Sequence, residues 1–388
     1  METYIPRFFK EPGQSFFLFG PRGTGKSTFL KHQYADALWI DLLKPDIFRT
    51  YAARPERIIE LVHGNPDKHI VIVDEVQKVP EILSAIHSLI EEKVNKRFIL
   101  TGSSARKLKR TGIDLLAGRV LLRTLHPFMI SELTMESAFE NILNYGLLPI
   151  VISSENPKDV LETYISLYMR EEVQLEGIVR NIGNFSRFLE SISFSHGALL
   201  NISNVARDCH VERKVVEGYV KILEDILLAF QIQVFTKRAK RALVSHPKFY
   251  FFDTGVFRAL RPKGPLDRPE EIEGAALEGL IVQHLKAWSA YRDNDYEIFF
   301  WCSRGGVEVD FVLYGENDIF AIEVKNADRV RPEYLRSLIA FRQDYPQSNA
   351  IFLYRGKEKL LKKNILCIPC DDFLKELTPD RDLTTFFL

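Results

Sequence analysis

Residues 20–28, GPRGTGKST, constrain the fold of this chain more than any other segment. They match the pattern G-x-x-x-x-G-K-[ST], and they stand between an apolar run at 16–19 and a helical pattern at 27–32. A strand, a glycine-rich loop and a helix in this order predict backbone N–H groups and a helix N-terminus that bind phosphate. We therefore expect ATP with Mg²⁺ as the bound nucleotide. The predicted nucleotide-binding residues are Gly20, Pro21, Arg22, Gly23, Thr24, Gly25, Lys26, Ser27 and Thr28.

Two acids, Asp74 and Glu75, follow the apolar run at residues 70–73. An uninterrupted apolar run predicts a buried strand, and ligands of α/β proteins bind at the carboxyl ends of such strands. There Asp74 and the Ser27 hydroxyl would hold Mg²⁺, and Lys26 would reach the β- and γ-phosphates. Glu75 would polarise the attacking water as general base. The pair of acids thus predicts hydrolysis of the nucleotide.

A third apolar run, at residues 98–100, leads into Thr101, Ser103 and Ser104. One of these hydroxyls could contact the γ-phosphate or the attacking water, and Ser103 is counted among the nucleotide-binding residues. The alternative is that they only close a turn. The alternation of apolar runs with helical patterns predicts an α/β fold, with a parallel sheet flanked by helices. The expected strands are residues 16–19, 38–41, 70–73 and 98–100.

The 388 residues exceed one ordinary core, and we predict three domains at residues 1–155, 156–262 and 263–388. The first holds the parallel sheet. The second reads as helical from 158 to about 229, followed by short strands and a basic turn between 231 and 254. A linker rich in proline and glycine at 262–269 precedes the third, a small α/β domain. There we expect a long amphipathic helix at 271–290 and strands at 297–301, 308–314, 319–324 and 349–354.

Lysine and arginine number 52, as do aspartate and glutamate, so any nucleic-acid-binding surface must be local. Four cysteines in a chain of this length do not form a disulfide framework, and they suit a reducing cytosol. The pair Cys367 and Cys370 lacks the second pair of a zinc site. Residues 1–10 do not read as a secretory leader, and no apolar run approaches the ~20 residues that cross a bilayer. We expect a cytoplasmic protein without a membrane partner.

The middle region carries two helical patterns around a tight turn. The first is expected to begin at a Ser203 cap, and the second covers residues 212–224. A basic hairpin follows, so the region resembles a winged helix. Its cations suit phosphate contacts, and a solvated charged hairpin is the alternative. These cations are Lys237, Arg238, Lys240, Arg241 and Lys248.

Near the end of the chain, Asp310 lies at the centre of one strand pattern, and Glu323 and Lys325 lie on the next. In E-x-K both side chains share a face because the side-chain period of a strand is two. With Glu278 from the preceding helix, the carboxylates would form a second Mg²⁺ or Mn²⁺ site beside an amine that positions water. The series E…D…E-x-K resembles the PD-(D/E)xK nuclease fold. The alternative is an inert cluster in which the acids pair with Lys325 and Arg304.

The ordered set GPRGTGKST, VIVDE, ILTGSS and LAGRV resembles AAA+-type P-loop ATPases. More narrowly, the chain resembles a bacterial and archaeal family in which an AAA-type domain (AAA_14) precedes a region of unknown function (DUF4143-like) with a nuclease-like end. The similarity continues through residues 127–133, 145–149, 201–228, 247–255 and 307–326. It implies that an arginine completes the ATP site, often from a neighbouring subunit. Arg119 is the first candidate and Arg123 the second, and a homo-oligomer would follow.

We therefore predict an ATPase that couples hydrolysis to the engagement or cleavage of DNA or RNA. The winged helix and the carboxyl-terminal domain would contact the nucleic acid. The alternative is an ATP-dependent switch that recruits a partner through catalytically inert carboxyl-terminal domains. A small-molecule kinase is a weaker hypothesis, because Asp74 and Glu75 suit the activation of water and the rest of the chain would be unexplained.

Overall fold

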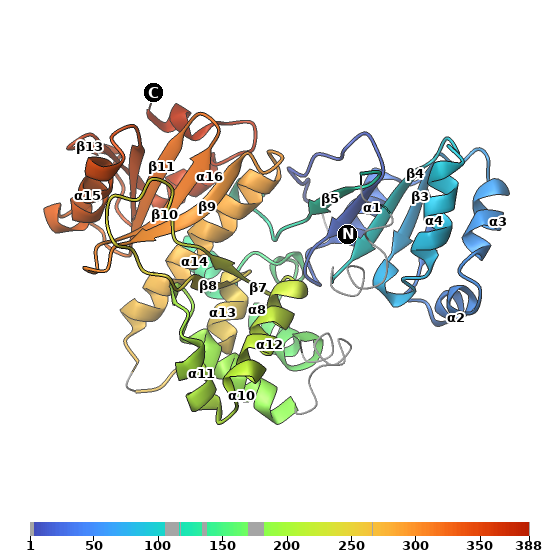
Figure 1. Cartoon of the computed structure of the whole chain (residues 1–388), viewed down its shortest axis with the longest axis horizontal. Helices are drawn as coiled ribbons and strands as arrows, with labels where there is room; N and C mark the ends of the chain where they lie inside the picture. The colour runs from blue at the N-terminus through green and yellow to red at the C-terminus, as the bar shows by residue number, and fades with distance from the viewer. Residues whose placement is uncertain are drawn as a thin grey trace. The chain divides into compact units, whose positions relative to one another are not determined.

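A computed structural model describes residues 4–104, 116, 118–133, 138–169, 182–265 and 267–387, without the side chains of 168 and 169 (Figure 1). The chain divides into two compact units. The first comprises Phe9–His126 and Ile222–Leu227, and the second comprises Met1–Phe8, Pro127–Lys221 and Leu228–Leu388. The three-domain division at 155 and 262 stays a prediction. In the described part of the chain, no helix has the length and apolar character needed to span a membrane.

The first unit is built on a five-stranded parallel sheet in the order β2-β3-β4-β1-β5. All the expected strands are present, and the P-loop NTPase type of sheet is confirmed. β5, which was not predicted, pairs with β1 at the edge. Because β4 lies between β1 and β3, the carboxyl ends of these three strands are neighbours. The strands are β1 (Phe16–Phe19), β2 (Leu38–Asp41), β3 (Ile70–Asp74), β4 (Arg97–Gly102) and β5 (Leu121–Thr124).

Helices beside this sheet cover its buried faces (Figure 1). β1 and β3 carry apolar side chains on both faces, and residues 16–19 and 71–73 are all buried, which is typical of a central parallel strand. Aliphatic side chains of α4, including Ile86, belong to the same buried core as Val71 and Phe98. The elements are α1 (Lys26–Gln33), α2 (Pro45–Ala53), α3 (Arg57–His63), η1 (Val76–Lys78) and α4 (Ile82–Glu91).

The second unit begins with a helical region that encloses a small antiparallel sheet, in the order β6-β8-β7. The strands are β6 (Ala198–Leu199), β7 (Ala229–Ile232) and β8 (Lys248–Phe251). The expectation of helix throughout residues 158–229 was wrong, since β6 pairs with β8. The other elements are η3 (Ile130–Glu132), α6 (Phe139–Tyr145), α7 (Pro149–Ile152), α8 (Pro157–Thr163), η4 (Tyr164–Met169), α10 (Ile182–Ser193), α11 (Ile202–Cys209), α12 (Arg213–Asp225) and α13 (Thr254–Leu260).

The start of α11 also differs from the expectation. Ser203 lies inside the helix, and Asn201 is the cap, because its side chain accepts the backbone N–H of Asn204 at 3.1 Å. Asparagine caps a helix as well as serine does. The extended backbone at Asn201 leaves the asparagine, and not the serine, at the capping position.

Asp253 joins two of the segments that carried the resemblance, residues 145–149 and 247–255. It is fully buried, and its carboxylate accepts the backbone N–H of Val256 at 3.2 Å, which caps α13. The same carboxylate accepts the N–H of Leu147 at 2.8 Å. Gly255 allows this approach, since a Cβ there would lie 2.0 Å from the carbonyl oxygen of Tyr145. These segments therefore have a structural role in holding α13 against the chain after α6.

A six-stranded sheet in the order β13-β14-β12-β11-β10-β9 completes the second unit. β9, β10 and β11 are antiparallel neighbours, β11, β12 and β14 run parallel, and β13 is antiparallel to β14. The further α/β domain is thus confirmed, and β13 and β14 extend it beyond the predicted strands. The strands are β9 (Tyr296–Cys302), β10 (Glu308–Gly315), β11 (Ile319–Lys325), β12 (Asn349–Tyr354), β13 (Leu360–Lys362) and β14 (Ile365–Pro369), and the helices are α14 (Pro269–Ala290), η5 (Pro332–Leu335), α15 (Arg336–Asp344), α16 (Cys370–Glu376) and η6 (Leu383–Phe387).

The long helix α14 is buried on nearly all sides and not amphipathic as expected. Its polar side chains Gln283, His284 and Ser289 are buried together with the apolar ones. The helix contacts β9 and β11 as well as α6 and α13, so protein surrounds it. His284 illustrates the consequence, because its Nε2 accepts the N–H of Ile130 at 2.9 Å.

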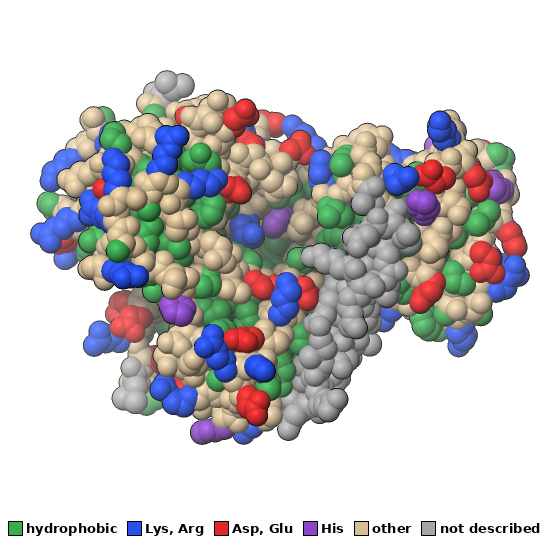
Figure 2. Space-filling view, in the orientation of Figure 1, with side chains coloured by type: hydrophobic (Ala, Val, Ile, Leu, Met, Phe, Trp, Pro, Cys, Tyr) green, Lys and Arg blue, Asp and Glu red, His purple; other side chains and the backbone are tan. Residues whose placement is uncertain are grey.

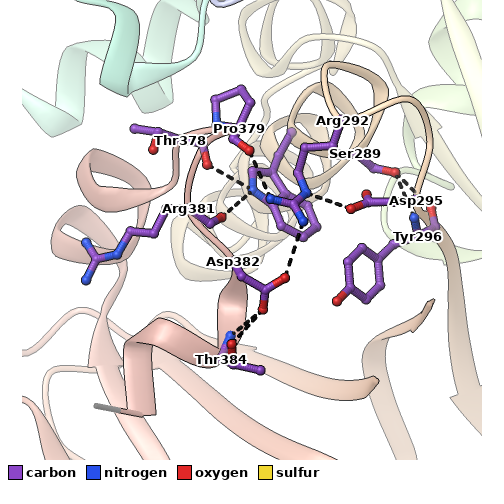
Figure 3. A network of polar contacts seen from close by, with 10 residues as sticks. Ser289, Arg292, Asp295, Tyr296, Thr378, Pro379, Arg381, Asp382 and Thr384 are labelled. Atoms are coloured by element: carbon purple, nitrogen blue, oxygen red, sulfur yellow. Dashed lines mark hydrogen bonds and ion pairs between the residues drawn. The ribbon is translucent and has the colours of Figure 1, made fainter. Parts of the chain in front are cut away.

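A polar network fixes the carboxyl end of α14 to the last residues of the chain (Figure 3). The guanidinium of Arg292 donates to Asp295 at 2.7 Å, to Asp382 at 3.3 Å and to the carbonyl oxygen of Pro379 at 2.9 Å. The indole N–H of Trp288 donates to the carbonyl oxygens of residues 378 and 381. These contacts set the position of α14, which carries Glu278.

Candidate functional site

The phosphate loop follows β1 and ends in α1, as predicted. Gly23 and Gly25 have φ values of 85° and 83°, the left-handed region that glycine adopts without strain. Lys26 is buried, and its ammonium donates to the carbonyl oxygens of Gly20 at 2.7 Å and Pro21 at 3.3 Å. At Gly20 a Cβ would lie 2.5 Å from a backbone oxygen. The loop is therefore a backbone cradle closed around its lysine, which is the arrangement that binds phosphate.

Hydroxyl groups from two elements converge on the carboxylate of Asp74. The hydroxyl of Ser27 in α1 donates to Asp74 Oδ2 at 2.8 Å, and the hydroxyl of Thr101 in β4 donates to Oδ1. Thr101 Oγ1 in turn accepts the backbone N–H of Glu75 at 3.0 Å. Mg²⁺ prefers oxygen ligands of this kind. Ser27 and Asp74 therefore suit a cation next to the phosphate loop, and Thr101 orients the carboxylate.

The carboxylate of Glu75 is held by the side chains of Ser103 and Gln77, and Gln77 was not predicted to take part in the site. Its φ of 60° lies in the left-handed region, which is rare for a glutamate. Gln77 donates to the Glu75 carboxylate and to Ser103 Oγ at 3.0 Å. Gly102 makes room for this amide, because a Cβ there would lie 2.7 Å from Gln77 Oε1. No motif marks Gln77, and only the fold brings it beside the general-base candidate.

The two arginine candidates differ in position, because Arg119 precedes β5 and Arg123 lies within it. Leu121 of β5 pairs with Phe16, so Arg119 lies at the amino edge of the sheet, opposite the edge that carries the phosphate loop. It is partly exposed and forms an ion pair with Glu91 at the end of α4. Arg123 pairs in register with Leu18, nearer the loop. Arg119 could therefore complete an ATP site only of another subunit, and this role stays a prediction.

The basic segment expected to form a wing is attached to β9. Backbone bridges join Val234 to Phe300 and Leu243 to Ser303. Two of the expected phosphate-binding cations are engaged in ion pairs, Lys237 with Glu297 at 2.8 Å and Arg241 with Asp344 at 2.7 Å. The winged helix itself stays a prediction.

Lys248 was assigned to the same exposed hairpin, and that assignment was wrong. The residue is only 1% exposed, because it lies in β8 between β6 and β7. Its ammonium points into the cluster of acids of the carboxyl-terminal sheet. It lies 2.9 Å from Glu278 Oε1 and 3.4 Å from Asp310 Oδ1, and it also pairs with Glu308.

The predicted acids come together, with this lysine among them. Asp310 lies where the register between β9 and β10 shifts, an irregularity that re-aims side chains. Its Oδ2 accepts the N–H of Val324 at 2.8 Å. Glu323 pairs with Lys325 at 2.6 Å, as the E-x-K pattern predicted. In the alternative of an inert cluster, Arg304 was expected to pair with the acids. Arg304 is exposed, and Lys248 pairs with the acids in its place.

The electrostatics of the cluster follow from burial. Burial raises the pKa of Glu323 to about 8 and that of Glu278 to about 7, and Asp310 adds to both shifts. Although burial alone would lower the pKa of Lys248, the carboxylates of Glu278, Asp310 and Glu308 raise it well above its ordinary value. Both glutamates thus bind protons near neutral pH, while the lysine stays charged.

The expected second metal site is not supported. Among the described residues, no three histidine, cysteine, aspartate or glutamate side chains are gathered as a metal ion requires. Glu278 and Asp310 meet through the ammonium of Lys248 and not around an open position. Cys367 and Cys370 are buried free thiols, in agreement with the structural interpretation of that pair.

Comparison with known proteins agrees with the geometry of the first unit. Residues 13–134 match the model of an AAA domain, which supports ATP binding and ATPase activity in this region. Residues 136–267 and 273–373 match models described as domains of unknown function, DUF8612 and DUF4143. A search of the curated proteins gives no match.

Three solved structures are weakly similar. The replication initiator DnaA bound to AMPPCP and single-stranded DNA is 13% identical, with a TM-score of 0.28 over 54% of this chain and 82% of its own. AMPPCP-bound DnaA from Aquifex aeolicus is 15% identical, with a TM-score of 0.27 over 54% of this chain and 81% of its own. Protein VC1899 from Vibrio cholerae is 11% identical, with a TM-score of 0.24 over 96% of this chain and 98% of its own. Similarity of this degree carries no functional argument.

Proposed function

We propose that the first unit is a Mg²⁺-dependent ATPase. The observation that carries the proposal is the chain of contacts from Ser27 through Asp74 to Thr101 and the N–H of Glu75, beside a complete phosphate loop. Lys26 and the loop N–H groups would bind the phosphates, and Ser27 and Asp74 would hold Mg²⁺, which supplies charge stabilisation when bound.

Glu75 would accept a proton from the attacking water. A general base must be oriented toward its proton, and the amide of Gln77 fixes the carboxylate by donating to one of its oxygens. The other carboxylate oxygen is left for the water. Ser103, which contacts both residues, would hold Gln77 in that orientation.

Two variants test the roles of the site. Lys26→Ala should lose nucleotide binding, measured with a fluorescent ATP analogue, because the phosphates lose their cation. Glu75→Gln should bind the analogue and release no phosphate, because the amide keeps the shape and loses the base. Lys31→Ala, an exposed lysine on the same helix, is the matched control and should leave both properties unchanged. Wild-type hydrolysis by either site variant would refute the assignment.

We further propose that hydrolysis is coupled to the engagement of nucleic acid by the second unit. Figure 2 shows Lys and Arg side chains gathered over the part of this unit that holds α15 and β13. Backbone and side-chain contacts join the chain after β11 to the chain after β12, since Arg355 N–H donates to Ala327 O at 2.9 Å and Lys362 donates to Val330 O. The exposed cations on these segments, here called the basic edge, are Arg329, Arg331, Lys357, Lys359, Lys362 and Lys363.

The basic edge supports phosphate contacts better than the expected wing does, because only Asp328, Glu333 and Glu358 oppose it on the same segments. The test is the fluorescence anisotropy of labelled DNA and RNA oligonucleotides over a range of salt concentrations. Reversing Lys357 and Lys359 to glutamate should weaken binding and flatten its salt dependence. Reversing two exposed cations of the first unit, Lys44 and Arg49, is the charge-matched control. An equal loss in both variants would show that only net charge matters.

Cleavage of the nucleic acid is a separate step that would need a divalent cation at Asp310 and Glu323. Glu323 Oε2 is buried and has no hydrogen-bond partner among the described groups, which favours a cation there. The ammonium of Lys248 beside Asp310 opposes it. We therefore propose engagement of nucleic acid without cleavage. A plasmid incubated with the protein and Mn²⁺ should stay intact. Nicking of the plasmid by the wild type, but not by Asp310→Ala, would contradict this proposal.

A further inference from the structure

We propose that Lys248 is a built-in cation that closes the acidic cluster of the carboxyl-terminal sheet to divalent metal. The ammonium occupies the space between Glu278 and Asp310 that a bound cation would take. This inference concerns the second unit alone, and it does not depend on ATP hydrolysis.

The hydrogen bonds of Lys248 are saturated by carboxylates. A lysine ammonium has three donors, and three carboxylates, those of Glu278, Glu308 and Asp310, surround it. The side chain is 2% exposed, so water does not compete for these donors. Removing the ammonium would leave the buried carboxylate of Asp310 without its cation, which is strongly unfavourable. A metal ion would have to displace a fully satisfied group.

The carboxylates are also fixed by other donors. The hydroxyl of Tyr250, two residues along β8, donates to Glu278 Oε1 at 2.6 Å. The backbone N–H of Val324 donates to Asp310 Oδ2 at 2.8 Å. Lys248 and Tyr250 thus approach the acids from the same strand. Glu278 Oε1 accepts a hydrogen bond from each of them, and Asp310 accepts one from Lys248 at Oδ1 and one from Val324 at Oδ2. These hydrogen bonds hold the two carboxylates in positions that suit the ammonium of Lys248.

The lysine and the acids belong to different parts of the chain. Lys248 lies in the region 136–267 that matches one family model, and the acids lie in the region 273–373 that matches another. β8 is held by β6 and β7 on its two sides. The closed state of the cluster therefore lasts while β8 stays packed, and displacement of this strand would open the cluster. The contact is an inhibitory one between two regions of the chain.

Mn²⁺ binding to the nucleotide-free protein tests the proposal. The bound fraction is measured from the electron paramagnetic resonance signal of the Mn²⁺ that stays free. Asp310→Asn should leave the Mn²⁺ binding of the wild type unchanged, because the wild type has no Mn²⁺ site at Asp310. Lys248→Met, which keeps the length of the side chain without its charge, should gain such a site, seen as Mn²⁺ bound in excess of the wild type. Adding Asp310→Asn to Lys248→Met should remove it. Lys286→Met is the matched control, because this lysine of α14 lies over the ring of Phe230.

Two results would overturn the proposal. One is a Mn²⁺ site in the wild type that Asp310→Asn abolishes. The other is a Lys248→Met variant that has the wild-type circular dichroism and the wild-type urea-unfolding midpoint but gains no Mn²⁺ site. If Lys248→Met does not fold, acetylation of the wild-type protein by acetic anhydride replaces it. Lys248 should then remain unmodified at every Mn²⁺ concentration, and modification that rises with Mn²⁺ would show that metal displaces the ammonium.

Discussion

Replacing Thr101 by valine removes one hydroxyl from the centre of the proposed ATPase site. Thr101 is fully buried, donates to Asp74 and accepts the N–H of Glu75 at 3.0 Å. Valine has nearly the same shape, so the change creates little cavity. It removes the group that links the proposed metal ligand to the proposed base.

The magnitude follows from the two hydrogen bonds. The bond to the Asp74 carboxylate involves a charged group and is worth about 1.5–3 kcal/mol. The buried N–H of Glu75 would lose its acceptor, at a cost of about 1–3 kcal/mol. We therefore expect the free energy of unfolding of the first unit to fall by roughly 2.5–6 kcal/mol. If about 2 kcal/mol of this loss is felt in the transition state, kcat falls about 30-fold.

The assays are steady-state phosphate release and urea unfolding. Thr101→Ser is the matched control, because it keeps the hydroxyl and loses only a methyl group, at a cost of about 1 kcal/mol. We expect Thr101→Val to lower kcat and the unfolding midpoint together, and Thr101→Ser to retain most of both. Hydrolysis and stability at the wild-type level in Thr101→Val would refute the role assigned to this hydroxyl.

Three further predictions concern other parts of the molecule. Arg7→Met should destabilise the second unit in urea by about 3–5 kcal/mol, because it leaves the fully buried carboxylate of Glu132 without its cation, whereas exposed Arg54→Ala should not shift the midpoint. Burial raises the pKa of Asp253 to about 6, so the folded state keeps this proton to a higher pH than the unfolded state. The free energy of unfolding should therefore fall by up to about 3 kcal/mol as the pH rises from about 4 to about 6. Asp253→Asn should remove this pH dependence. Arg119→Ala should slow hydrolysis only at protein concentrations where the chain self-associates, and a loss that is equal at all concentrations would count against action between subunits.

The first unit could be predicted from the sequence because its signals are local. The phosphate loop is continuous, and the acids Asp74 and Glu75 directly follow one buried strand. Strand order was not predictable, since parallel strands pair through crossovers that leave no short-range pattern. The position of β4 between β1 and β3, which places Thr101 beside Asp74, therefore required the structure.

The carboxyl-terminal cluster was predictable only in part. Glu323 and Lys325 share one strand, so their pairing follows from the period of two. Lys248 precedes Glu278 by 30 residues and Asp310 by 62, and nothing near it in the sequence indicates a buried position. It follows a run of exposed basic residues, and it was assigned to their hairpin for that reason. Burial in β8 decides its partners, and burial is a property of tertiary packing.

A count of charges explains why a complete set of motif acids does not establish a metal site. The cluster holds the carboxylates of Glu278, Glu308, Asp310 and Glu323 and the ammonium groups of Lys248 and Lys325. The motif includes three of the acids, Glu278, Asp310 and Glu323, and one of the cations, Lys325. These four residues carry an excess of two negative charges, which a divalent ion would balance. Lys248 and Glu308, which the motif does not contain, carry opposite charges, so the excess stays at two negative charges. Protons on Glu278 and Glu323, whose pKa values are about 7 and about 8, balance them near neutral pH. The cluster can therefore be neutral without metal, because buried glutamates bind protons near neutral pH.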